Sequence, residues 1–268
     1  MTDELDGKQG VQSLEVGMSI LRAMAAGKRA MMLKDIAAAT EMPPSKVHRY
    51  LVSLIRSGLV EQDPMTSRYD LGAFALNLGL VALDRIDRIR LGLNAIVNLR
   101  DAVNETTALG VWSPQGPIVI RWERPRRPIT VNVVAGTPLA ILNSALGRAF
   151  AAWLPEAATD AAIQAELATG KGPTGVTTLA GTREFLADIR AQGYSAITGD
   201  YYVNGVEAVA APVFNVKNQV TLALTLVAVE GTMDLSPASP TIRELCSAAH
   251  ELSVRLGSTL PPGPCVEG

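Results

Sequence analysis

The residues from 45 to 56 combine side-chain chemistries that suit contact with a nucleic acid. Hydroxyl, amine, imidazole and guanidinium groups come from Ser45, Lys46, His48, Arg49 and Ser53. An arginine can pair with guanine, whereas the other groups bind phosphates or base edges. Apolar residues fall between them at helical spacing, at Val47, Leu51, Leu54 and Ile55. The pattern predicts an amphipathic helix with one buried face and one face suited to the major groove of DNA.

The charge around this helix is locally basic. From Arg22 to Arg56 seven basic residues stand against two acidic ones, a net charge of +5, whereas the whole chain carries −2. A chain without a basic excess gives no global argument for nucleic acid, so the argument rests on this segment. The alternative interpretation is a basic helix with an ordinary solvated face.

Residues for catalysis are few. The two histidines are His48, on the basic helix, and His250, which shares a helix face with Cys246 four positions earlier. A Cys/His nucleophile pair is conceivable there, but the surroundings are typical of a terminal packing helix. The sequence has no HExxH, CxxC or phosphate-loop pattern. We therefore expect no catalytic residue, no metal and no cofactor, and a protein that is not an enzyme.

The compartment follows from the ends of the chain and from cysteine use. The N-terminus is polar and acidic, unlike a signal peptide, and no apolar run reaches the roughly 18 residues that span a bilayer. The two cysteines, Cys246 and Cys265, form no close pair, and Cys265 lies in a Pro-rich tail. We expect a cytoplasmic protein without membrane contact, whose cysteines are reduced and form no disulfide.

The N-terminal residues are predicted to form three helices followed by a small β-hairpin. Helices are predicted over about 13–26, 33–40 and 45–57, followed by short strands at 59–62 and 68–71 around a turn at 63–67. Three helices and a small hairpin predict a winged helix-turn-helix. A helical stretch follows from Gly72 to about Val103, with a break expected near 90–92.

The remainder alternates strands and helices. Strands are predicted over 106–112, 117–123, 129–135, 206–214 and 220–229, and helices over 143–153, 156–168, 182–192 and 236–256. Thr182 is the expected N-cap of the third of these helices, with Gly193 after its end. Strands in groups with helices between them predict an α+β domain with an antiparallel sheet flanked by helices.

Two long runs carry a resemblance to a known family. LEVGMSILRAM and LKDIAAATEMPPSKVHRYLVSLIRSGLVEQDPMTSRYDLG closely resemble the DNA-binding domain of the IclR family. AGTPLAILNSALGRAFAAWL and IRAQGYSAITGDYYVNGVEAVAAPVFN resemble its effector-binding domain. The resemblance covers about residues 12–257.

The resemblance implies a domain order and a set of partners. It implies a winged helix-turn-helix domain over 12–72, a linker helix over 73–90, a GAF-like effector-binding domain over 91–258 and a flexible tail over 259–268. It also implies homodimers or dimers of dimers that bind palindromic double-stranded operator DNA and control catabolic operons. The expected effector is a small organic, aromatic or sugar acid, and repressors and activators both occur.

The resemblance implies that the family's recognition helix falls on Pro44 to Ser53, with Ser45, Lys46, His48 and Arg49 as its main DNA contacts. With the wing residue Arg68, which could reach a phosphate or the minor groove, the expected contacts are Lys34, Pro44, Ser45, Lys46, His48, Arg49, Ser53 and Arg68. The family often has threonine where Val47 stands, so a contact by that hydroxyl is absent here.

The family's effector site maps onto strands, a helix start and a loop. These positions are Val131, Val133, Asn143, Ser144, Ala145, Leu146, Asp200, Tyr201, Val206, Ala208 and Thr225. A helix start offers free backbone N–H groups and a positive dipole end, which suit a carboxylate. Asn143 or Ser144 could instead cap its own helix, Tyr201 could be a surface residue, and Glu207 could face solvent. Some members have cysteine where Ala208 stands.

The sequence leaves two classes of function open. The first is a ligand-responsive DNA-binding regulator. The second is a small-molecule-binding or catalytic α+β domain whose N-terminal helices serve only dimerisation. Operator binding that weakens with salt and with loss of Arg49 separates them. The sequence names neither the effector nor the operator.

Overall fold

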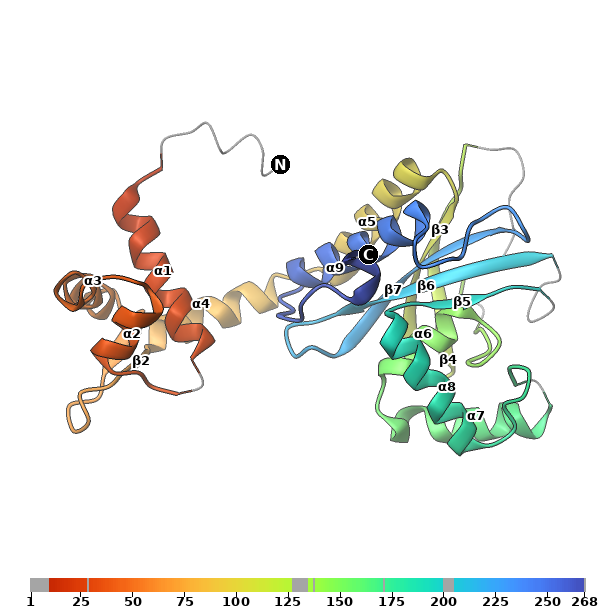
Figure 1. Cartoon of the computed structure of the whole chain (residues 1–268), viewed down its shortest axis with the longest axis horizontal. Helices are drawn as coiled ribbons and strands as arrows, with labels where there is room; N and C mark the ends of the chain where they lie inside the picture. The colour runs from red at the N-terminus through yellow and green to blue at the C-terminus, as the bar shows by residue number, and fades with distance from the viewer. Residues whose placement is uncertain are drawn as a thin grey trace. The chain divides into compact units, whose positions relative to one another are not determined.

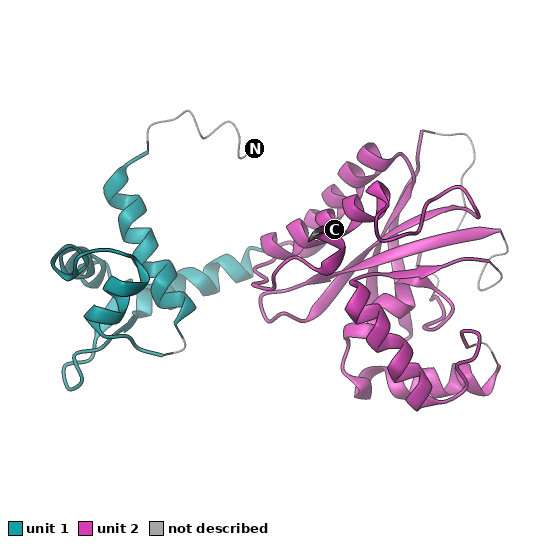
Figure 2. Ribbon diagram, viewed as in Figure 1, with its two compact units in different colours: residues 1–86 teal, residues 87–268 magenta. Residues whose placement is uncertain are grey.

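In a computed structural model the chain divides into two units. The units comprise Met1–Ile86 and Asp87–Gly268 (Figure 2). The structure describes residues 10–27, 29–126, 135–136, 138–170, 172–199 and 205–267. Among these, no helix is both long and apolar enough to cross a membrane.

The first unit has the predicted three helices and hairpin (Figure 1). Its elements are α1 (Gln12–Ala26), α2 (Leu33–Ala39), α3 (Pro44–Arg56), β1 (Val60–Gln62), β2 (Tyr69–Leu71) and α4 (Ala73–Asp84). The strands β1 and β2 pair antiparallel. Ile20, Ile36, Val47 and Leu51 form a core with no exposed surface, and Tyr69 closes it from the hairpin. The wing is therefore packed on the three helices rather than appended to them.

The second unit is built on a five-stranded antiparallel sheet of order β4-β3-β7-β6-β5. Its strands are β3 (Thr106–Ser113), β4 (Gly116–Glu123), β5 (Ser195–Ile197), β6 (Val206–Phe214) and β7 (Val220–Val229). Its helices are α5 (Arg88–Val103), α6 (Ala145–Trp153), α7 (Glu156–Ala168), α8 (Leu179–Gln192), α9 (Pro240–Arg255) and α10 (Pro264–Glu267).

Helices cover both faces of this sheet (Figure 1). On one face α5 packs against β3 and α9 packs against β6, and the two helices contact each other. On the other face α6 packs against β6 and β7, with α8 against α6 and α7 against α8. The predicted α+β fold with an antiparallel sheet flanked by helices is confirmed.

Gly110 of β3 allows α6 to approach the sheet closely, because a methyl group there would occupy the space of the Leu146 side chain. Gly147 of α6 instead allows the preceding loop to pack on the helix, since a methyl group there would collide with the carbonyl oxygens of Ala140 and Ile141. The start of α6 therefore lies against the sheet with little separation, which places its first residues over β3 and β7.

Three element boundaries differ from the sequence prediction by three residues or more. The helical stretch breaks at residues 85–87 rather than 90–92, because the Asp87 carboxylate accepts a hydrogen bond from Arg90 N (2.9 Å) and so caps α5. The predicted cap of α8, Thr182, is wrong: Thr178 caps it by accepting from Gly181 N (3.1 Å). The last long helix starts at Pro240 rather than Ser236, since proline fits the first helical turn. The three-residue β5 was not predicted.

The C-terminal end also differs from expectation. Cys246 and Cys265 form a disulfide, so the prediction of two reduced cysteines is wrong for this structure. The segment expected to be a flexible tail includes α10, which packs against α8 and α9. The predicted strand over 129–135 falls mostly outside the described residues.

Candidate DNA-binding and effector-binding sites

Helix α3 separates its apolar and polar residues as the sequence predicted, with one exception. Val47 and Leu51 have no exposed surface, whereas Ile55 is 36% exposed and does not belong to the buried stripe. Pro44 occupies the first turn, where its missing N–H costs nothing. The remaining candidates share the outer face: Ser45, His48, Arg49 and Ser53 are exposed, and Lys46 is half-buried.

One of these groups is already engaged within the helix. The Ser53 hydroxyl donates to the carbonyl oxygen of Arg49 at 3.4 Å. It must rotate away from that bond before it can donate to DNA. Ser45, His48 and Arg49 have no such internal partner among the described contacts, so they are the freer groups on this face.

The wing is held to the body of the first unit. The exposed Arg68 donates from Nη1 to the carbonyl oxygen of Ala30 at 3.0 Å, just before α2. At the wing tip the Asp63 carboxylate accepts from Thr66 Oγ1 (2.8 Å) and Met65 N (2.7 Å). These hydrogen bonds lower the pKa of Asp63 below its ordinary value, because they favour the charged carboxylate. Lys34 is exposed on α2.

The start of α6 gathers four of the candidate effector residues. Asn143, Ser144, Ala145 and Leu146 are all buried. The Ser144 hydroxyl accepts from Gly147 N (2.9 Å) and donates to the carbonyl oxygen of Ala140 (2.6 Å). Ser144 therefore caps its own helix, the structural alternative left open by the sequence. Its side chain is occupied by the fold, and what remains for a ligand at this end is the backbone of α6.

A row of side chains across the sheet faces this helix start. Ala108 of β3 pairs with Trp122 of β4 on one side and with Thr225 of β7 on the other, and Thr225 pairs with Ala210 of β6. Cross-strand partners point to the same face of a sheet. Ala108 packs with Leu146 of α6, so the whole row faces α6. Trp122 was missed by the sequence reading.

Two hydrogen-bonding groups in this row have no partner among the described residues. They are Trp122 Nε1 and Thr225 Oγ1, and both atoms are inaccessible to solvent. Buried polar atoms are ordinarily hydrogen-bonded, so an unpartnered pair calls for a reason such as a ligand. Ala108 and Ala210, which lie between and beside them in the row, have side chains without a hydrogen-bonding group, so neither can satisfy these donors.

The other candidate positions divide into two groups. Val206 and Ala208 of β6 pack with Ala145 in the cluster that also contacts Trp122, so the structure brings them to the same helix start. Val131, Val133, Asp200 and Tyr201 lie outside the described residues.

Two buried or half-buried carboxylates that the sequence analysis missed or placed on the surface hold loops of the second unit. Glu207, considered solvent-facing, is only 2% exposed, and its carboxylate accepts from the backbone N–H groups of Gly231 (3.0 Å), Thr232 (3.1 Å) and Met233 (2.5 Å). Glu166 of α7 accepts from Ile141 N (2.6 Å) and Leu142 N (2.8 Å). These carboxylates fix two loops of the second unit.

The buried Arg148 ties α6 to its surroundings. Its Nε donates to the carbonyl oxygen of Leu142 (2.6 Å), its Nη1 donates to that of Ala196 (2.9 Å), and its guanidinium lies over the Phe185 ring. The only signal in the sequence was a charge within an apolar helix. Within the described part of the chain, no three His, Cys, Asp or Glu residues converge to hold a metal.

Comparison with protein families gives a match in each unit. The IclR helix-turn-helix domain matches residues 13–64, and the bacterial transcriptional regulator IclR C-terminal domain matches residues 81–254. The chain belongs to the IclR family. Its helix-turn-helix thus lies in the first unit, and the family's effector domain is the sheet with its flanking helices.

Individual relatives of this IclR-family chain are similar over nearly its whole length. It is 31% identical to the glycerol operon regulatory protein of Streptomyces griseus, over 95% of this chain and 98% of that protein. It is 24% identical to the HTH-type transcriptional repressor AllR of Klebsiella pneumoniae, over 83% and 82% of the two chains. The crystal structure of Pseudomonas aeruginosa HmgR superposes with a TM-score of 0.83 at 37% identity, over 94% of this chain and all of that one.

These similarities decide the class of function. The curated relatives reported above are transcription regulators, and this chain is a ligand-responsive bacterial transcription regulator of the IclR family, not an enzyme. It binds DNA through its helix-turn-helix and carries an effector-binding domain.

Proposed function

We propose that the chain is a cytoplasmic repressor of a catabolic operon that releases its operator when a small organic, aromatic or sugar acid binds. A homodimer or a dimer of dimers binds a palindromic operator through Ser45, Lys46, His48 and Arg49, with Lys34, Pro44, Ser53 and Arg68 beside them. AllR, a relative of this chain, is named as a repressor. The glycerol operon regulatory protein is named for a catabolic operon.

The proposed effector class depends on one observation. Trp122 Nε1 and Thr225 Oγ1 are buried donors without a described partner, and they lie in one row beneath the start of α6. The first N–H groups of a helix are likewise without intrahelical partners and carry a positive partial charge. A carboxylate has only acceptor sites, so it can satisfy indole, hydroxyl and backbone donors together.

The coupling of effector to operator follows from the domain order. A ligand shifts a two-state equilibrium only by its differential affinity for the two states. The effector domain follows α4 directly in the chain, and α4 follows the wing. An acid that favours one arrangement of the effector domains thereby changes the spacing of the two DNA-reading heads. Tight acid binding with no change in operator affinity would refute this coupling.

The experiment that tests the proposal is fluorescence polarisation with the DNA upstream of the protein's own gene. Binding is measured at several salt concentrations, with and without a panel of organic, aromatic and sugar acids. Tight, salt-sensitive binding that one acid weakens is the expected result. Affinity no higher than for unrelated DNA would favour the alternative, in which the N-terminal helices serve only dimerisation.

Arg49→Ala is expected to weaken operator binding by about 1–3 kcal/mol, because it removes an exposed guanidinium from the outer face of α3. The matched control is Arg255→Ala, which removes an exposed arginine from the second unit with the same change in charge. Polarisation titrations at one salt concentration compare the variants. Unchanged affinity in the Lys46→Ala/Arg49→Ala double variant would contradict the assignment of α3 as the reading helix.

Thr225→Val is expected to weaken effector binding without destabilising the protein. The lost hydroxyl has no described partner, so its removal costs the fold nothing and costs the complex about 1–2 kcal/mol, or about 5- to 30-fold in affinity. Thr107→Val is the matched control, since the buried Thr107 hydroxyl donates to the carbonyl oxygen of Ile96 (2.8 Å). That variant should lose about 1 kcal/mol of stability and keep its effector affinity.

Calorimetry with the acid found in the panel measures the affinities, and thermal unfolding measures the stabilities. If Thr225→Val lost stability but bound the acid as tightly as the wild type, its hydroxyl would be a structural group and the effector would lie elsewhere.

A further inference from the structure

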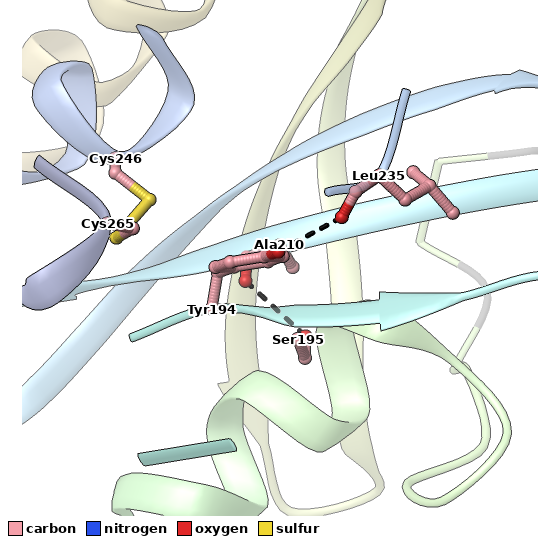
Figure 3. The surroundings of a disulfide bond; sticks show 6 residues. All are labelled: Tyr194, Ser195, Ala210, Leu235, Cys246 and Cys265. Carbon is pink, nitrogen blue, oxygen red and sulfur yellow. Dashed lines mark hydrogen bonds between the residues drawn. A yellow bond between two sulfur atoms is a disulfide. The ribbon is translucent and has the colours of Figure 1, made fainter. Parts of the chain in front are cut away.

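The only two cysteines of the chain join its last helix-forming segments. Cys246 lies in α9 and Cys265 in α10, 19 residues later, and a disulfide connects them (Figure 3). The bond fastens the C-terminal segment, residues 258–267, back onto α9. Both cysteines lie in the second unit, where α10 packs against α9 and against α8.

Little else fastens the end of this segment. Asn218 accepts from the Ser258 hydroxyl (3.0 Å) and Thr259 N (3.1 Å) through its Oδ1, which fixes the first two residues. Beyond Leu260, no hydrogen bond in the described part of the chain joins the segment to the rest of the protein. Helix α10 has four residues. Apart from the packing of α10 on α8 and α9, the disulfide is therefore the link between residues 261–267 and the domain in the described part of the chain.

The glycine at position 193 leaves space for the C-terminal segment to pack against the end of α8. Gly193 ends α8 at a φ of 88°, and a methyl group there would lie 3.1 Å from Cys265 Sγ and 3.3 Å from Pro264 Cδ. A side chain at that position would press on the segment. The positive φ thus ends the helix and also opens the place that Cys265 occupies.

The fastened segment forms one wall of a cavity of about 300 Å³. Trp153, Phe214 and Cys246 line the cavity from the domain side. Its ionisable lining residues are Arg190 and His250, and no carboxylate lines it among the described residues. The thiolate is the reactive form in thiol–disulfide exchange.

We propose that Cys246 and Cys265 are a redox-modification site, a reversible dithiol–disulfide pair that exchanges with low-molecular-weight thiols and disulfides. Its reduction detaches the C-terminal segment and opens the cavity. A small thiolate attacks Cys265 Sγ, and the Cys246 sulfur leaves as a thiolate that takes a proton. A second small thiolate attacks the small-molecule sulfur of the mixed disulfide, which releases Cys265 and forms a small disulfide. The reverse sequence, starting from a small disulfide, restores the bond.

The exchange is relevant to the protein because of the compartment in which the protein works, and that argument rests on the proposed function. A protein that binds operator DNA works where thiol buffers act, and disulfides found there are usually transient and redox-sensing. Both cysteines are buried, with Cys246 3% and Cys265 6% exposed. Exchange therefore requires the segment to lift, and a segment that few hydrogen bonds join to the rest of a domain opens locally at low cost.

The first test is a redox titration of the folded, full-length protein. The protein is equilibrated with mixtures of reduced and oxidised glutathione and quenched with an alkylating agent. Intact mass then gives the fractions with none or two alkyl groups, and the mixed disulfide differs from both in mass because it carries one alkyl group and one glutathione. We expect the oxidised fraction to follow the quotient [GSH]²/[GSSG] along one curve from either direction, because each protein disulfide exchanges with two glutathione thiols. A protein that stayed fully oxidised or fully reduced over the whole range would overturn the proposal.

The second test follows the segment itself with a carboxypeptidase. Residues 265–268 should be removed readily from the reduced wild-type protein and be protected in the oxidised one. Cys265→Ser should be digested equally under both conditions, and Ser258→Ala, which keeps both cysteines, should behave as the wild type. Equal protection of the reduced and oxidised wild type would overturn the release of the segment. Neither test uses DNA or an effector, so both are separate from the test of the proposed function.

Discussion

Replacing Glu207 with alanine is expected to lower the free energy of unfolding of the second unit by about 3 kcal/mol. One carboxylate, 2% exposed, accepts from three consecutive backbone N–H groups, at Gly231, Thr232 and Met233. Its removal leaves these donors without an acceptor in a buried place, and hydrogen bonds to a charged group are the strong ones. For a domain of this size the melting temperature should fall by about 6–12 °C.

Tryptophan fluorescence reports this unfolding selectively, because Trp112, Trp122 and Trp153 all lie in the second unit. The control is Glu230→Ala, which removes an exposed carboxylate from the same loop region and should change the melting temperature little. Glu207→Gln keeps one acceptor oxygen and should fall between the two. Equal melting temperatures for Glu207→Ala and Glu230→Ala would show that the loop does not depend on the buried carboxylate.

The local elements of this fold could be predicted because periodicity and caps are local signals. The strands 206–214 and 220–229 and the helix 156–168 have the predicted bounds. Errors arose where two residues of the same type compete, as at Thr178 and Thr182, which lie one helical turn apart. A three-residue edge strand such as β5 carries too few residues for any alternation to show.

The residues of a site could be predicted only where they all lie on one helix or strand. The outer face of α3 is a property of 13 consecutive residues, and its exposure agrees with the pattern except at Ile55. The row from Trp122 through Ala108 to Thr225 depends on the register of three strands, two of which are more than a hundred residues apart. The same holds for Glu207 and for the disulfide, because the sequence pattern does not predict which residues distant in the chain a side chain will contact.

The helix α4 is apolar on all sides and unburied in the single chain. Phe74, Leu78 and Val81 follow one another at helical spacing, and Leu76, Leu80 and Leu83 do so on the opposite side. None of its residues is buried, and Leu76 and Leu78 are 65% and 55% exposed. A helix that is hydrophobic all round is ordinarily enclosed by other elements. Under the proposed function, a second copy of the chain covers α4.

The double variant Leu78→Glu/Leu80→Glu is therefore expected to be monomeric and to bind the operator about 10²- to 10⁴-fold more weakly, because one head then binds without its tethered partner. Glutamate keeps the helix and places a charge on each apolar side. Asn77→Glu, which adds a charge at an exposed polar position of α4, should stay dimeric and bind normally. Sedimentation and polarisation titrations measure the two properties. Since dimerisation through α4 predicts that they change together, a dimeric double variant with wild-type operator affinity would assign another surface to the dimer.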